Sequence, residues 1–301
     1  MSTMDANGIV PTRKHWIALA SLGVIWGTTW IAADSLSEYI PPLYAAAARF
    51  LLAALVWCPV ILWRRLRLPL GRPLGFVLLL SVSMIALPAL LLQWARQYAS
   101  SVTVTVSLAA MPFLLVVLTP APRRAMTAAA VGLGGVALAL NAPFSLSQAA
   151  GAAIALVAVV SIGISALLVR RELRGVNPVV VTSVLLGAAA VELFLSSLVF
   201  ERGQVIQWNR TAVGSVLFLA LVAGAPAYAI YFWLLQQLEA YKVVTVQWIE
   251  PLMALFEAAI LLRLGFSISM IAGTLFTLTS LLLVMRGRPE DDNTVSLVPN
   301  S

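Results

Sequence analysis

Apolar runs of about 20 residues recur along nearly the whole of this 301-residue chain. Each run is long enough to cross the hydrocarbon core of a bilayer as a helix, which takes about 20 residues. Only 10% of the residues are charged and 61% are apolar, whereas a soluble domain carries about 25% charged residues. The runs are also too long and too uniformly apolar for the strands of a membrane barrel. The chain therefore predicts an all-α polytopic membrane protein.

The apolar runs divide into ten predicted transmembrane helices. They cover residues 16–33, 43–63, 74–97, 101–119, 125–141, 149–169, 177–199, 212–237, 243–263 and 268–285. With an even number of spans, both termini lie on one face of the membrane. That face holds 14 Lys and Arg residues, the opposite face holds 4, and Arg49 lies within a span. Positively charged loops stay cytoplasmic, which predicts cytoplasmic termini in a multi-pass protein of the cell inner membrane.

The net charge of +7 follows from these loop residues, so it does not indicate a nucleic-acid partner. Cys58 is the only cysteine of the chain, which excludes an intramolecular disulfide and a cysteine metal site. No cofactor is expected. The oligomeric state is not predicted by the sequence.

Two stretches, 86–116 and 224–256, resemble each other. Pro88 matches Pro226, Gln97 matches Gln236, and Pro112 matches Pro251, at a period of about 139 residues. Gly132 and Gly273 are a further matched pair. A period of five spans is odd, so the second copy is predicted to be inverted relative to the first, as in many secondary transporters. The predicted parts are an N-terminal segment (1–15), a first five-helix repeat (16–141), a second, inverted five-helix repeat (142–285) and a disordered cytoplasmic tail (286–301).

The segments GVIWGTTWIAADSL (23–36) and PPLYAAAARFLLAAL (41–55), with the proline-containing fourth and ninth spans, resemble the drug/metabolite transporter superfamily of the EamA type. The resemblance covers nearly the whole chain. It implies a fold of five plus five spans and the movement of amino acids or other small metabolites, mostly outward. Many relatives carry a glutamate near the ends of spans 4 and 9. This chain reads LTPAPRR (118–124) and LRLGFSIS (262–269) there, without an acid.

Four charged residues lie within the predicted spans: Arg49, Glu192, Glu250 and Glu257. Charges in hydrocarbon are costly and usually face a partner or a water-filled cavity. Glu250, beside the helix-breaking Pro251, is a candidate for binding a substrate ammonium or carrying a proton. The alternative is a structural ion pair between Glu250 and Arg49. Glu192 is a weaker candidate that could instead pair with Arg49, and Glu257 could lie near Arg263.

Aromatic and polar side chains within the spans could line a binding cavity, although they could equally anchor helices at the membrane interfaces or join one helix to another. The predicted substrate-binding residues are Trp26, Trp30, Arg49, Trp94, Tyr98, Ser107, Ser161, Tyr228, Tyr231, Gln247, Trp248 and Glu250. The candidate hinges, which could also be static kinks, are Pro88, Pro112, Pro226 and Pro251.

Three classes of function compete: a secondary transporter, an intramembrane enzyme and a structural membrane protein. His15 is the only histidine, and no HExxH, GxSxG or nucleotide-binding loop occurs, so we expect a transporter and no enzyme. Its partners would be the lipid bilayer, a small-molecule substrate and protons as a candidate coupling ion, with facilitated transport as the alternative. Amino acids, aromatic or apolar and moved outward, are the favoured substrates. Drugs, nucleosides and vitamins stay open.

Overall fold

The computed structural model describes residues 11–119, 121, 123–141, 146–261 and 267–286, and no strand occurs among them. The helices of the first half of the chain are α1 (Arg13–Gly27), α2 (Thr29–Ser37), α3 (Pro42–Val56), α4 (Cys58–Trp63), α5 (Arg72–Leu80), η1 (Ser81–Ala86, a π-helix), α6 (Leu87–Ala95), α7 (Ser101–Ala109), α8 (Met111–Leu118) and α9 (Arg123–Ala139). The all-helical class that the apolar runs predict is confirmed for this part of the chain.

The second half of the chain is helical as well. Its helices are η2 (Leu146–Gln148, a 3₁₀ turn), α10 (Ala149–Glu172), α11 (Pro178–Phe200), α12 (Arg210–Leu221), α13 (Ala225–Gln237), α14 (Ala240–Val243), α15 (Val246–Leu261) and α16 (Ile268–Arg286). The tail from residue 287 onward, the Glu257 side chain with Arg263, and the Trp30 side chain lie outside what the structure describes.

Six helical stretches among the described residues are long and apolar enough to cross a bilayer. They are Pro42–Trp63, Arg72–Ala95, Ala149–Glu172, Pro178–Phe200, Arg210–Gln237 and Ile268–Met285, and a shorter apolar helix covers Val102–Leu118. The other predicted spans are represented by α1 with α2, which are separated by a turn at Thr28, by α9 and by α15. The count of ten spans and the side on which the termini lie stay predictions.

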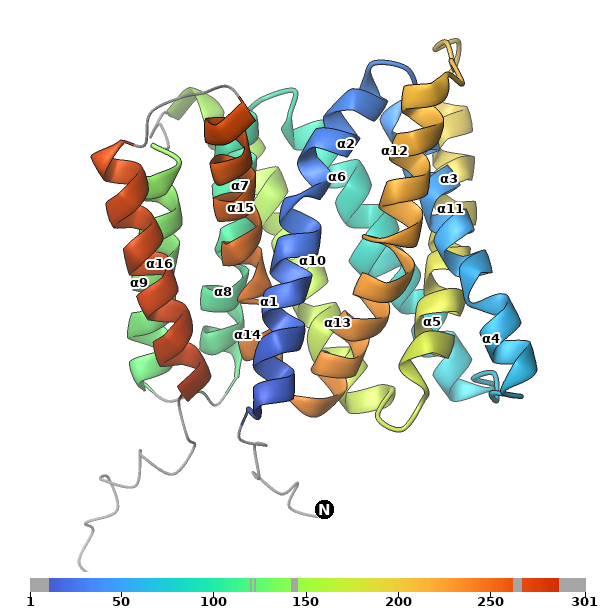
Figure 1. Cartoon of the computed structure of the whole chain (residues 1–301), viewed down its shortest axis with the longest axis horizontal. Helices are drawn as coiled ribbons and strands as arrows, with labels where there is room; N and C mark the ends of the chain where they lie inside the picture. The colour runs from blue at the N-terminus through green and yellow to red at the C-terminus, as the bar shows by residue number, and fades with distance from the viewer. Residues whose placement is uncertain (1–10, 120, 122, 142–145, 262–266, 287–301) are drawn as a thin grey trace, which may run out of the picture.

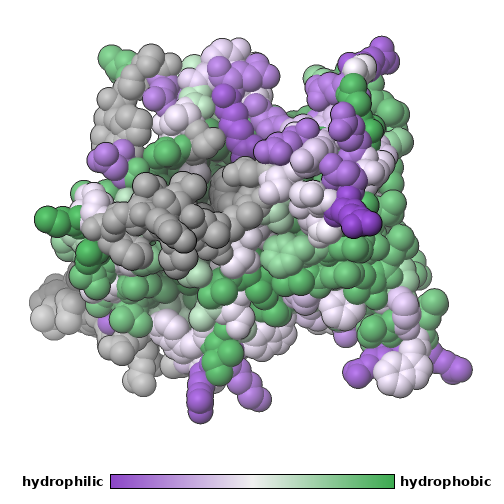
Figure 2. Space-filling view, turned by 45° about the horizontal axis from the view of Figure 1, so that its top comes forward, coloured by the Kyte–Doolittle hydropathy of each residue, from purple (hydrophilic) through white to green (hydrophobic). Residues whose placement is uncertain are grey.

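The outer surface of the bundle is suited to lipid. Large apolar side chains such as Val157, Leu195 and Leu275 are 57%, 56% and 60% exposed. Figure 2 shows hydrophobic residues across the middle of one face and hydrophilic residues gathered at its upper and lower ends. An apolar surface this extensive is incompatible with a water-facing monomer, but it matches a hydrocarbon surround.

The bundle has two edges. The start of α1 and the end of α16 lie at the lower edge in Figure 1, which we call the terminal edge. The link from α2 to α3 and the upper end of α6 lie at the opposite edge, which we call the far edge (Figure 1). The pair α9 and α16 forms one flank of the molecule, and α3 with α11 lies toward the other (Figure 1).

Three of the four candidate hinge prolines stand at helix starts. Pro88, Pro112 and Pro226 are each the second residue of a helix. Pro226 follows a break at Gly224, where the missing N–H leaves no hydrogen bond unmade, whereas Pro88 and Pro112 follow directly on preceding helical turns. Pro251 alone stays inside a helix, α15. The π-helix η1 comes directly before the helix of Pro88, because a proline cannot donate the i→i−4 bond and the register of the preceding turn shifts. Whether these positions act as hinges stays a prediction.

The packing partners of the two halves correspond. Helix α1 packs against α13 and α15, while α10, which follows it by one repeat, packs against α6 and α7. In the other two cases a helix packs against its own counterpart in the other half: α3 packs against α11, and α9 packs against α16. Exchanging the halves therefore preserves these helix contacts.

Small residues allow α9 and α16 to approach closely. A Cβ atom added at Gly135 would lie 2.5 Å from the Thr277 hydroxyl and 2.9 Å from the Gly273 carbonyl oxygen, and one added at Gly273 would lie 2.5 Å from the Gly135 carbonyl oxygen. Gly135 therefore stands opposite Gly273 across this contact. Gly132 instead makes room for the ring of Trp248.

We predict that Gly135→Ala destabilises the protein, because the added methyl group meets the backbone of α16 and overpacks the contact by about 1–3 kcal/mol. Gly134→Ala is the matched control, since nothing lies within 4 Å of its added Cβ. Thermal unfolding of the purified protein in detergent measures both. Equal melting temperatures for the two variants would contradict the close α9–α16 contact.

Candidate functional site

A cavity of about 310 Å³ lies among helices of both halves. Its lining comes from α1, α2, α3, η1, α6 and α7 of the first half and from α10, α12, α13 and α15 of the second. Six of the twelve predicted binding residues line it: Trp26, Arg49, Tyr228, Tyr231, Gln247 and Glu250, together with Pro88. Sequence positions about 200 residues apart thus meet at one chamber.

Two opposite charges face this cavity without touching each other. Arg49 on α3 and Glu250 on α15 both line it, and their charges interact through space. No ion pair within 4.0 Å joins these two described residues. The predicted structural ion pair is therefore not formed in this conformation, and space remains between a fixed cation and a fixed anion.

Arg49 has unused hydrogen-bonding capacity. Its guanidinium carbon lies 4.6 Å from the centre of the Phe50 ring. Its Nε is buried and has no hydrogen-bond partner within the described part of the chain. A buried donor without a partner is costly, so a ligand oxygen reaching this guanidinium would satisfy it.

An aromatic wall stands beside the two charges. The Trp26 ring lies 5.4 Å from Tyr228 and 5.3 Å from Tyr231 between centroids, and Phe50 lies edge-on to Tyr228 at 5.9 Å. The Trp26 indole N–H donates to the Ala223 carbonyl oxygen at 3.1 Å, which fixes the ring against α12 and α13. Rings held in this way offer flat apolar surface and π faces that attract a cation.

The cavity leads to the far edge. A second chamber of about 280 Å³ shares Ala46, Arg49, Ala89, Leu92, Arg96 and Leu219 with the first. It continues to Ser37, Pro42 and Gln93, at the end of α2, the start of α3 and the last turns of α6. Arg96 stands along this route and donates to Gln93 Oε1 at 3.1 Å. Arg96 was counted only as a loop charge from the sequence, and no motif marks it as a lining residue.

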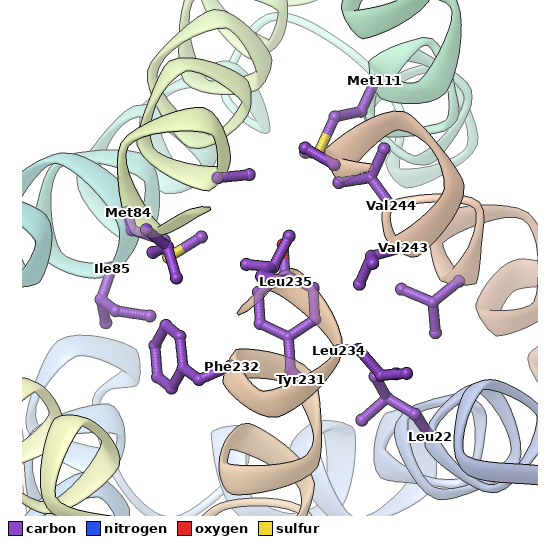
Figure 3. Packing of buried hydrophobic residues seen from close by; sticks show 14 of the residues in the cluster. Leu22, Met84, Ile85, Met111, Tyr231, Phe232, Leu234, Leu235, Val243 and Val244 are labelled. Carbon is purple, nitrogen blue, oxygen red and sulfur yellow. The ribbon is translucent and has the colours of Figure 1, made fainter. Parts of the chain in front are cut away.

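Toward the terminal edge, apolar side chains close the bundle. Figure 3 shows Leu22, Met84, Met111, Leu234, Leu235 and Val244 in one buried cluster, which come from α1, η1, α8, α13 and the residue after α14. Each is at most 5% exposed. We call this set the apolar seal. A cavity open at one edge and closed at the other suits one state of a two-state transporter.

Polar contacts stabilise the α13–α14 segment, which lies next to the apolar seal on the side of the terminal edge. Lys242 on α14 is only 1% exposed, and its Nζ lies 2.8 Å from Glu239 Oε2. Gln236 at the end of α13 donates from its amide to the carbonyl oxygens of Leu173 and Val176, at 3.1 and 3.0 Å. The Gln236 hydrogen bonds tie the end of α13 to the link between α10 and α11, and the ion pair neutralises the buried lysine within the α13–α14 segment.

The other predicted binding residues lie elsewhere. Trp248 is fully buried and donates from its indole to the Ala109 carbonyl oxygen at 2.9 Å. Trp94 and Tyr98 contact each other edge-on and are 51% and 48% exposed. Ser107 donates to the Thr103 carbonyl oxygen and Ser161 to that of Ser83. Among the described residues, these five do not line the cavity, and no cluster of three His, Cys, Asp or Glu residues offers a metal site.

Comparison with known proteins gives a consistent picture. The EamA-like transporter family matches this chain twice, over residues 14–141 and 149–286. YoaV of Bacillus subtilis (strain 168), described as an uncharacterized transporter, is 25% identical over 272 residues, covering 87% of this chain and 93% of that protein. PagO of Salmonella typhimurium is 27% identical over 262 residues, covering 77% and 80%. A solved crystal structure matches with a TM-score of 0.78 at 15% identity, covering 90% and 97%, which shows a shared fold.

We predict one-sided access to the cavity. With Cys58→Ser removing the native thiol, Ala89→Cys should react with a membrane-impermeant maleimide added on the far-edge side, because Ala89 lines both chambers. Leu235→Cys in the apolar seal, where the native side chain is 0% exposed, should react from neither side. Labelling of sided membrane vesicles measures both, and reaction of Ala89→Cys only from the terminal-edge side would contradict the opening seen here.

Proposed function

Because the chain belongs to the EamA-like transporter family, we propose that it is a secondary transporter that moves a small organic metabolite across the cell inner membrane by alternating access. The observation that carries this proposal is the cavity between the two halves, open at the far edge and closed at the terminal edge by the apolar seal. Its relatives YoaV and YvbV of Bacillus subtilis (strain 168) are described as transporters. We propose no enzymatic activity.

The favoured substrate is a zwitterionic amino acid with an aromatic or apolar side chain, moved outward. Its carboxylate would satisfy the unpartnered Nε of Arg49, since arginine pairs with carboxylates through charge-assisted hydrogen bonds. Its ammonium would face Glu250 and the rings of Trp26 and Tyr228. The volume of about 310 Å³ lies in the range of small-molecule sites, which starts near 300 Å³.

Alternating access follows from the exchangeable halves. The double match of the family over residues 14–141 and 149–286 and the corresponding helix contacts support a structural repeat, and we propose that its two copies are inverted in the membrane. Repeats related in this way can exchange their packing arrangements and so open the central site to each side in turn. Both termini would then be cytoplasmic, and the far edge would face the exterior.

Energy coupling in this proposal involves a proton on Glu250. The sequence has no nucleotide-binding loop, so we propose transport driven by a gradient. A carboxyl facing both the cavity and Arg49 can exchange a bound proton for a substrate ammonium, since either one neutralises the acid. Facilitated transport without a proton is the competing mechanism.

We predict that Glu250→Gln and Arg49→Gln each lower the transport of the preferred amino acid by about tenfold or more. Each removes one charge-assisted contact worth about 1.5–3 kcal/mol. Uptake of radiolabelled leucine, phenylalanine and tryptophan into proteoliposomes, with and without a pH gradient, measures the effect. A pH gradient should accelerate uptake by the wild-type protein but not by Glu250→Gln.

Trp94→Ala is the matched control, because its half-exposed ring lies away from the cavity lining, and it should transport like the wild type. An unchanged rate and pH response in Glu250→Gln would refute the role of Glu250. Absence of transport of all three amino acids, with another metabolite carried, would refute the substrate class alone.

A further inference from the structure

Glu192 is a membrane-embedded carboxyl that the cavity does not use. It lies on α11, about 21 Å from the first residue of that helix and about 12 Å from the last at a rise of 1.5 Å per residue. It is absent from the described lining of the cavity. The neighbouring Val191 and Leu195 are 57% and 56% exposed, so this carboxyl is set between an apolar outer surface and the helix η1.

The hydrogen bonds around Glu192 indicate a protonated acid. The Ser81 hydroxyl oxygen lies 2.7 Å from the Leu78 carbonyl oxygen and 2.6 Å from Glu192 Oε1. A hydroxyl has a single proton to donate, and both of these neighbours are acceptors when the carboxyl is ionised. The Ser81 hydroxyl can donate fully to only one of these two acceptors, and a proton on the Glu192 carboxyl would supply the second hydrogen bond.

The other carboxyl oxygen supports the same conclusion. Glu192 Oε2 is buried and has no hydrogen-bond partner within the described residues. An ionised carboxylate with one oxygen buried and unpaired would be far more costly than a neutral acid. Ser81 itself is 0% exposed, so water does not reach the contact from that side.

No described cation or second acid is paired with Glu192. The helices packed against α11 are α3, α4, α5, η1 and α13. Their titratable residues are Tyr44, Arg49, Cys58, Arg72, Tyr228 and Tyr231. Arg49, Tyr228 and Tyr231 line the cavity, and Arg72 pairs with Glu172 at 2.9 Å. The Tyr44 ring packs against Phe194 and Trp208, and the Cys58 thiol faces the Ala54 carbonyl oxygen.

The element that holds Ser81 also reaches the cavity. Met84 and Ile85, in the same π-helix, line it, so η1 connects the Glu192 contact on one face to the cavity on another. The Ser83 hydroxyl pairs with Ser165 at 2.7 Å, and Ser161 donates to the Ser83 carbonyl oxygen. π-Helical turns are frequent at functional sites, and this one joins the Glu192 contact to the cavity.

We propose that Glu192 and Ser81 form a proton-binding site, separate from the cavity, that joins η1 of the first half to α11 of the second. In the bound state the carboxyl O–H donates to the Ser81 oxygen and holds the two helices together. Release transfers this proton to water, which requires η1 and α11 to separate enough to hydrate the carboxylate. The link from this site to substrate movement rests on the proposed function, whereas proton binding itself does not.

Infrared difference spectroscopy of the full-length protein in lipid vesicles, between acidic and alkaline buffer, tests the site without any substrate. The wild-type protein should show the carbonyl band of a buried, protonated carboxylic acid that is lost on raising the pH. Glu192→Gln should remove one component of this band, and Glu250→Gln, whose own carboxyl can contribute a separate component, is the matched control that should retain the Glu192 component. A Glu192→Gln spectrum equal to that of the wild type would overturn the proposal.

Ser81→Ala tests which group donates the hydrogen bond between Ser81 and Glu192. It also replaces the first test if Glu192→Gln fails to fold. If the carboxyl O–H donates to Ser81, losing that acceptor weakens proton binding by roughly tenfold, so the band should disappear at a lower pH than in the wild type. If Ser81 instead donates to an ionised carboxylate, the band should disappear at a higher pH. The second result would overturn the proposal. Because neither measurement involves transport, failure of the proposed function would leave both outcomes unaffected.

Discussion

The cost of a polar group in hydrocarbon governs how the buried polar and charged side chains of the described helices are arranged. Lys242 is buried but paired with Glu239, and Gln236 is buried but donates to two carbonyl oxygens. Arg49 and Glu250 are satisfied differently, because both face a cavity. Since a charge at the bilayer centre costs roughly 2.5–3.5 kcal/mol on insertion scales, a chain that keeps two such charges apart must gain something from the space between them.

Close helix packing elsewhere in the bundle compensates for the contacts that the open cavity does not make. Helix α9 approaches α16 through Gly135 and Gly273, and α1 approaches α15 where Gly23 and Gly27 face Ile249 and Met253. In lipid, such contacts rather than apolar burial hold helices together. The peripheral contacts therefore fix the bundle, while the centre can remain open without loss of the fold.

The sequence predicted the class of the fold and much of the cavity, for a clear reason. Arg49, Glu250 and Tyr228 are polar groups in apolar runs. Such groups face the interior of the bundle, where they lie near one another and away from lipid. The sequence did not predict that Trp248 turns away toward Gly132 and Ala109, because the face that a helix presents depends on partners distant in the chain. The π-helix η1 was missed as well, since a one-residue change of register leaves the apolar pattern of 74–97 unchanged. The polar residues Ser81 and Ser83 are the only sequence feature of the segment 81–86 that departs from the apolar pattern.

The sequence repeat also shows that the two edges of the bundle are chemically unequal. With the offset that matches Gln97 to Gln236, Leu235 of the apolar seal corresponds to Arg96, and Phe232 corresponds to Gln93. Leu235 and Phe232 are 0% exposed, whereas Arg96 and Gln93 line the open route. Under the proposed alternating access, closing the far edge would bury the Arg96 guanidinium, whereas the terminal edge is closed next to a Lys242 that is already paired with Glu239. We therefore infer that the empty protein favours the conformation open at the far edge. A substrate that binds between Arg49 and Glu250 would have to stabilise the opposite conformation by its own contacts, because a ligand shifts such an equilibrium only through a difference in its affinity for the two states.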